Sequence, residues 1–219
     1  MSAPAKASHL PPPGAGSVAL DLLAFGAGLV LAWQQGWKAA DLVWSLWLSS
    51  LVVGYAMIVW IIAGPLVRGG PAAWEGTKPA GGPALRVIGG LFLLAFFTVH
   101  FGGFHFGHSV FLGMFFPLVP GGETPNWATY SEVWTRYWVW LPLAFVAERA
   151  GFTPAADPKA KKLAPMTVPY RNVIRMHLLI FFFAGAHFAK VDNFAVYAVV
   201  YAAYFLPWTA LWRAIKGHA

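Results

Sequence analysis

Long apolar runs with almost no charge dominate this sequence and restrict its fold more than any other feature. Hydrophobic residues make up 58% of the 219 positions and charged residues only 11%, whereas about a quarter of the residues in a soluble domain are charged. A helix needs about 20 predominantly apolar residues to cross a bilayer. The chain is therefore predicted to be an all-α, polytopic membrane helix bundle.

Six segments are candidate transmembrane helices, two of them imperfect. They cover residues 18–33, 42–67, 85–119, 133–147, 173–189 and 194–212. The third would be about 50 Å long as a helix, more than one bilayer thickness. It therefore either tilts and projects from the membrane or breaks at Gly102 and Gly103. Pro142 is expected to kink the fourth segment, and Pro207 lies near the end of the sixth.

The distribution of positive charge predicts the orientation. If the N-terminus is cytoplasmic, all but three of the fifteen Lys and Arg residues lie on the cytoplasmic side, the exceptions being Lys38, Arg136 and Lys190. This asymmetry follows the positive-inside rule. We expect six helices in the inner membrane of a bacterium, with both termini cytoplasmic. Residues 1–17 are expected to be a disordered tail rather than a signal peptide, 18–213 the single transmembrane domain, and 214–219 a short C-terminal tail.

Composition also excludes several classes of function. The chain has no cysteine, and therefore no disulfide, thiolate metal site or cysteine nucleophile. Its net charge of +7 is concentrated in a few loops as a topology signal, so membrane lipid is the expected partner and nucleic acid is not. The serines of the second helix, Ser45, Ser49 and Ser50, lack the surroundings of a hydrolase nucleophile. No catalytic residue is predicted, and enzymatic activity is left open.

The segment TVHFGGFHFGHSVFL, residues 98–112, places three histidines in an apolar, glycine-rich helix. Ionised side chains in hydrocarbon cost roughly 2.5 kcal/mol or more, so polar residues there usually face a bundle interior or a cofactor. The predicted topology brings His187 of the fifth helix to the same outer half of the membrane. His177 lies about 15 Å from His187 along that helix and is assigned to a second site or to none.

Four imidazoles at similar depth suggest a ligand set. Without thiols, imidazole favours copper, zinc, iron or a haem iron. The candidate cofactor and metal ligands are His100, His105, His108 and His187. On a helix His105 and His108 are about 60° apart and could share one ion, while His100 and His108 share a broad face. The alternative is that neutral histidines only bond neighbouring helices, for about 1 kcal/mol or less.

Glycines beside the histidines allow two interpretations. Gly102, Gly103 and Gly107 would admit a flat macrocycle with phenylalanines as its apolar wall, or they would simply let two helices pack closely. Among the other polar candidates, Asp21 is either a helix N-terminal charge or the partner of a basic residue such as Arg175.

Two segments, WSLWLSSLVVGY (44–55) and HFGGFHFGHSVFL (100–112), resemble those of a bacterial family of polytopic membrane proteins known as domain of unknown function 6498. The matching positions are Trp47 and Gly54 in the second helix, His100, Phe101, Gly102, Phe104 and His108 in the third, and Arg175 and His177 in the fifth. Many relatives carry a glutamate at the position of Ser49. The resemblance implies a compact membrane protein and assigns no activity.

Three functions are therefore considered. The leading hypothesis is that the intramembrane histidines bind a metal or haem-like cofactor for electron transfer or metal handling. A small proton-coupled transporter with the histidines as relay groups is the second. The third is an accessory subunit that packs on a larger membrane complex or on a second copy of the chain.

Overall fold

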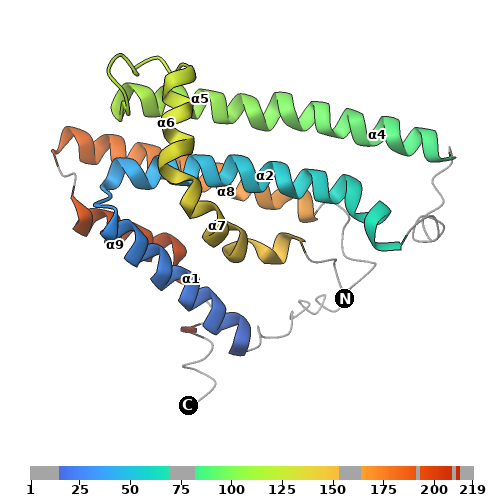
Figure 1. Ribbon diagram of the computed structural model, residues 1–219, viewed down its shortest axis with the longest axis horizontal. Helices are drawn as coiled ribbons and strands as arrows, with labels where there is room; N and C mark the ends of the chain where they lie inside the picture. Colours follow the sequence, from blue (N-terminus) through green and yellow to red (C-terminus); the bar gives the residue numbers. More distant parts are fainter. Residues whose placement is uncertain (1–14, 70–81, 153–163, 191–192, 209–210, 213–219) are drawn as a thin grey trace, which may run out of the picture.

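The computed structural model describes residues 15–69, 82–152, 164–190, 193–208 and 211–212 (Figure 1). Within these ranges every regular element is helical, which confirms the predicted all-α class. The α-helices are α1 (Ala15–Gln34), α2 (Ala39–Gly69), α4 (Gly82–Phe97), α5 (Gly103–Phe115), α6 (Trp127–Tyr137), α7 (Leu141–Ala147), α8 (Ala164–Phe188) and α9 (Phe194–Phe205). The predicted tails, 1–17 and 214–219, lie mostly or wholly outside the described residues.

Three of the described helical stretches are long and apolar enough to cross a membrane. They are Gly16–Gln34, Ala39–Gly64 and Val87–Phe115. Two further apolar stretches, Val173–Ala186 and Phe194–Phe205, are shorter. These lengths agree with a membrane protein, because about 20 apolar residues suffice to span the hydrocarbon core.

The predicted third span, residues 85–119, is one continuous helix as far as Phe115 and is not helical beyond it. A π-helical turn, Thr98–Gly102, joins α4 to α5, and Gly103 keeps helical backbone angles (φ −59°, ψ −42°). The break considered at Gly102 and Gly103 is therefore absent. The stretch Val87–Phe115 has 29 residues, about 44 Å of helix. Wide turns of this kind occur often near functional sites, and this one carries His100.

Two prolines coincide with helix boundaries: Pro142 lies at the start of α7, and Pro207 follows the end of α9. The predicted fourth span is divided, because α6 ends at Tyr137, a 3₁₀ turn follows, and α7 starts with Pro142 in its first turn. Proline fits a helix start, since the N–H that it lacks has no partner there. Leu206, which precedes Pro207, is extended and ends α9 at Phe205, as the restricted geometry before proline requires.

Helix α2 is the centre of the bundle. It packs most extensively on α8 and also contacts α5, α6, α7 and α9, and in the ribbon view it runs below α4–α5, where it overlaps α8 (Figure 1). Its indoles bind the third span directly, because Trp44 donates to the carbonyl of Phe116 at 2.9 Å and Trp47 to that of His105 at 2.8 Å. These bonds fix the histidine-bearing helix against the core.

Gly54 on α2 allows a close approach by the π-helical turn. A Cβ atom at this position would lie only 2.8 Å from Cε1 of Phe101, whose ring is fully buried. Only glycine leaves space for that ring without a shift of one of the helices. Trp47 and Gly54, both members of the sequence pattern described above, thus position the segment that carries His100, His105 and His108.

Candidate functional site

A cavity of about 430 Å³ lies between α5 and α8, within the usual range for small-molecule sites. Its walls come from the π-helical turn, α5 and α8: Val99, His100, Gly103, Phe104, Gly107, His108, Phe111, His177, Ile180 and Phe181. Val99 is 79% exposed and Phe181 70% exposed. The cavity therefore opens on the outer, apolar surface of the bundle.

One helical face supplies most of this lining. His100 and His108 both contribute to it, in agreement with the shared face predicted from their spacing. A Cβ atom at Gly103 or Gly107 would meet nothing within 4 Å. These two glycines therefore do not serve helix packing among the described residues, and the missing side chains leave part of the cavity open.

His108 and His177 bring two imidazoles together across the α5–α8 interface. Nε2 of His108 lies 3.0 Å from Nε2 and 3.1 Å from Nδ1 of His177, and the ring centroids are 4.1 Å apart. Nδ1 of His177 also lies 3.0 Å from the carbonyl oxygen of Val173. A carbonyl only accepts, so in the neutral ring Nδ1 carries the proton and Nε2 has a lone pair, which accepts from Nε2–H of His108.

The position of His177 differs from the sequence-based prediction, which assigned it to a second site or to none. The predicted fifth span begins at residue 173, whereas α8 begins at Ala164. His177 consequently lies near the middle of α8 rather than at its end. The structure places its ring against His108 of α5, in the group of histidines from which the sequence analysis had separated it.

His105 points to a different neighbour. Its Nδ1 lies 3.0 Å from the carbonyl oxygen of Phe101, its ring packs against Trp47 at 6.1 Å between centroids, and it is absent from the cavity lining. Nε2 of His105 and Nδ1 of His108 are both buried without a partner among the described residues. The two rings are 6.1 Å apart between centroids.

Two histidines of the predicted ligand set remain. His100 stacks on Phe96 at 5.5 Å and meets Phe104 edge-on at 5.1 Å between centroids. His187 lies in α8, but its side chain is outside the described residues. In the described part of the chain, no three His, Asp or Glu side chains gather closely enough to hold a metal ion. The predicted set of four ligands, which includes His187, therefore stays a prediction.

A second cavity, of about 410 Å³, lies among α1, α2, α7, α8 and α9 and carries charged groups. Its polar lining includes Asp21, Ser49, Ser50, Glu148 and Arg175, together with Tyr201 and Tyr204. Asp21 forms an ion pair with Arg149, which also donates to the hydroxyl of Ser17 at 2.7 Å. Of the two roles predicted for Asp21, pairing with a basic residue is observed, but the partner is Arg149 rather than Arg175.

Sequence comparison extends over almost all of the helical region. The profile of a family of unknown function, DUF6498, matches residues 15–204, which include the linings of the first cavity and most of the second. Neither the curated proteins nor the solved structures contain a match to the chain.

Proposed function

This chain belongs to the family of unknown function DUF6498, and we propose that it is an integral membrane protein that binds a haem-like cofactor between α5 and α8 for electron transfer. The observation that carries the proposal is the ring of His177. Its Nδ1–H bonds the carbonyl of Val173, which directs the lone pair of Nε2 to the cavity wall, where it accepts from Nε2–H of His108 and would bind a metal once that bond is given up. Histidines that ligate a metal are usually held in this way by the second ring nitrogen.

A macrocycle suits the cavity better than a bare ion. A metal ion requires three or more protein ligands, and no such group forms among the described residues. A metal-bearing macrocycle supplies its own equatorial nitrogens and needs one or two axial imidazoles. His177 offers one, with His108 as the hydrogen-bond partner that the metal would displace, while Gly103 and Gly107 leave space beside Phe104 for a flat ring.

The chemistry of such a site is one-electron transfer. Axial imidazole ligation and a low-polarity wall are two of the means by which proteins set a haem potential. In this cavity Phe104, Phe111 and Phe181 provide the apolar wall, and the polar lining is limited to His100, His108 and His177.

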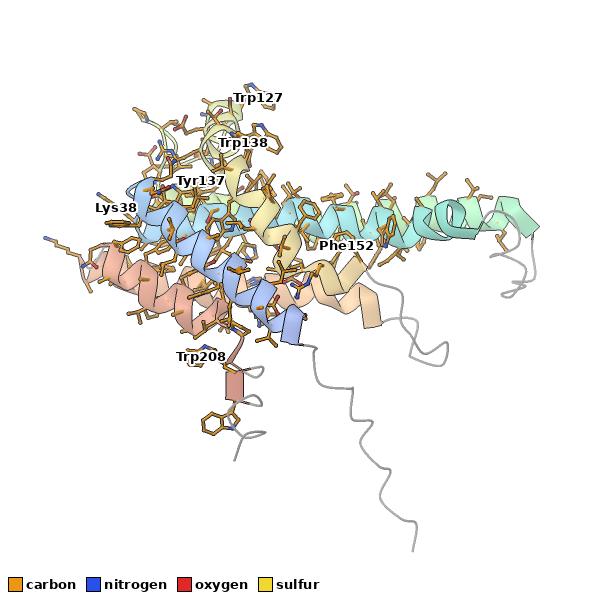
Figure 2. All side chains as sticks on the ribbon, turned by 60° about the horizontal axis from the view of Figure 1, so that its bottom comes forward. Lys38, Trp127, Tyr137, Trp138, Phe152 and Trp208 are labelled. Atoms are coloured by element: carbon orange, nitrogen blue, oxygen red, sulfur yellow. The ribbon has the colours of Figure 1, made fainter. Side chains whose placement is uncertain are left out.

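We place the protein in the bacterial cytoplasmic membrane with six spans and both termini in the cytoplasm. Two of the three basic residues assigned outside lie at one end of the bundle, where Arg136 is 3.8 Å from Asp41 and the backbone N–H of Lys38 bonds the same carboxylate at 2.8 Å. Lys38 and Tyr137 lie near each other there (Figure 2). Arg149, assigned inside, pairs with Asp21 at the other end of α1.

The test is an optical spectrum of the full-length protein purified in mild detergent after expression with haem supplementation. We expect a Soret band and near-stoichiometric haem, both lost in His177→Ala. His105→Gln is the matched control, because it removes a buried imidazole that does not line the cavity. A spectrum without any chromophore, or one that His177→Ala leaves unchanged, would refute the proposal.

The hydrogen bond between His108 and His177 favours proton relay as the second candidate. With His105, these rings form a succession of three imidazoles at 6.1 and 4.1 Å between centroids, and chains of histidines are used as relays in transporters. In proteoliposomes with an imposed pH gradient we expect proton flux that disappears in His108→Gln. Flux equal to that of protein-free vesicles would eliminate this candidate.

A further inference from the structure

The second cavity contains the guanidinium of Arg175, whose expected partner, Asp21, pairs with another arginine. Asp21 lines this cavity and pairs with Arg149, which is also bonded to Ser17 and Val146. Among the described residues, the side chain of Arg175 takes part in no ion pair or hydrogen bond. A guanidinium inside a membrane bundle is costly without an anion or a polar partner. Because Glu148 also lines this cavity, an incoming anion would be held by the guanidinium of Arg175 itself and not by the overall charge of the lining.

A buried hydroxyl provides an independent indication. Ser50 is 8% exposed, and its Oγ has no hydrogen-bond partner among the described residues. Its neighbour Ser49 differs, because its hydroxyl donates to the carbonyl of Ser45 at 2.6 Å. Buried hydroxyls are normally paired, and an unpaired one costs about 1–3 kcal/mol. Ser50 thus offers a free donor in the lining that includes Arg175.

The remaining lining residues indicate the size and polarity of the part of the ligand that does not bind Arg175. Apolar and aromatic side chains predominate, among them Phe25, Leu46, Trp140 and Leu179. A cavity of about 410 Å³ suits a small molecule rather than a polymer. The same cavity includes the carboxylate of Glu148, which disfavours a doubly charged phosphate. One planar guanidinium matches a single carboxylate in a bidentate arrangement.

We infer that this second cavity binds a small amphipathic carboxylate, with its head group on Arg175 and Ser50 and its apolar body against the walls from α1, α2 and α7. The inference is independent of the proposed cofactor, whose residues His108 and His177 line the other cavity. Free fatty acids and anionic lipids both present an amphipathic anion, and the cavity volume favours the free, single-chain acid.

The test uses the full-length protein in nanodiscs of zwitterionic lipid, titrated with decanoate and, as the uncharged control, with decanamide. We expect decanoate to bind at least about tenfold more tightly, in line with a charge-assisted hydrogen bond. Arg175→Gln should remove this preference, and Ser50→Ala should weaken decanoate binding about threefold or more. His108→Gln, a change in the other cavity, should leave the affinity for decanoate unaltered.

Several outcomes would overturn the inference. Equal affinities for decanoate and decanamide would do so, as would undiminished binding of decanoate by Arg175→Gln. If Arg175→Gln does not fold, Ser50→Ala and Arg175→Lys take its place, and unchanged affinity in both counts against the site. Displacement of decanoate by phosphatidylglycerol added to the nanodisc, dependent on Arg175, would show that an anionic lipid occupies the cavity and would overturn the assignment to a free acid.

Discussion

Helix α8 contributes to both cavities, and the polar side chains on its two faces differ in kind and in how they are bonded. His177, Ile180 and Phe181 line the cavity beside α5, while Arg175, Met176 and Leu179 line the other. On the first face the polar atoms belong to imidazole rings, and Nδ1 of His177 is bonded within its own helix. On the second they are charged, and the ion pair of that cavity joins residues from distant parts of the chain, Asp21 and Arg149.

This difference shows where each cavity obtains its stability. A neutral imidazole bonded to a carbonyl one turn away retains that bond wherever its helix goes. An ion pair between α1 and the 3₁₀ turn that follows α7 exists only in the assembled bundle. The bond of His177 to Val173 should therefore survive small rearrangements of the helices, whereas the charged cavity should lose its pairing when α1 moves.

The largest expected effect concerns how α5 is attached to α2. Gly54→Val places a branched side chain against the buried ring of Phe101, and overpacking of this kind costs about 3 kcal/mol. We expect a large fall in thermal stability in detergent and loss of cofactor binding by the cavity beside α5. Gly26→Val is the matched control on α1, where a Cβ atom meets nothing within 4 Å. Equal effects of the two variants would contradict the role assigned to Gly54.

The next effect concerns the ion pair of the charged cavity. Asp21→Asn leaves Arg149 without its carboxylate, and the two side chains are each 31% exposed. We expect a loss of about 2 kcal/mol, the usual range for a hydrogen bond between charged groups. A double-mutant cycle with Arg149→Gln measures the coupling by thermal unfolding. Additive single effects would show that the pair does not stabilise the fold.

A smaller effect is expected at the indole that holds the histidine helix. Trp47→Phe removes the bond to the carbonyl of His105 and keeps most of the ring packing, at a cost of about 1 kcal/mol. Trp33→Phe is a suitable control, because Trp33 is 69% exposed. Thermal unfolding of both variants checks the expectation, and identical transition temperatures would argue against a stabilising bond.

The smallest expected effect on stability belongs to a substitution at Gly107, which should nevertheless strongly impair haem binding. Gly107→Leu adds a side chain where the cavity is open, so we expect a stability change within about 0.5 kcal/mol and impaired haem uptake. Gly89→Leu, on a surface with similar free space, should leave haem uptake intact. Normal haem content in Gly107→Leu would place the cofactor outside this cavity.

Hydropathy predicts much of this fold because each helix that crosses a bilayer must be long and apolar by itself. The extents of α1 and α2 follow from uninterrupted apolar runs, and Pro142 and Pro207 locate a helix start and a helix end through local backbone restriction. The beginning of α8 at Ala164 was missed, because residues 164–172 are only weakly apolar.

The candidate site was predictable only in part. His100 and His108 share a face because helical spacing is a local property. The contact between His108 and His177 depends on the relative axial position of α5 and α8. The ion pair between Asp21 and Arg149 depends on which part of the chain packs against α1. The π-helical turn at Thr98–Gly102 has no clear sequence signal either. Its extra residue per turn changes the face of the helix on which His105 and His108 lie.

Val99 and Phe181 are exposed at the mouth of the first cavity, so the proposed cofactor would enter sideways from the bilayer. A molecule that enters in this way is delivered by partitioning, and its concentration per volume of lipid governs occupancy, rather than its concentration in the aqueous buffer. Dilution of the protein with more lipid at constant total ligand should then lower occupancy. Under this proposal the membrane would be both the solvent of the protein and the reservoir of the ligand.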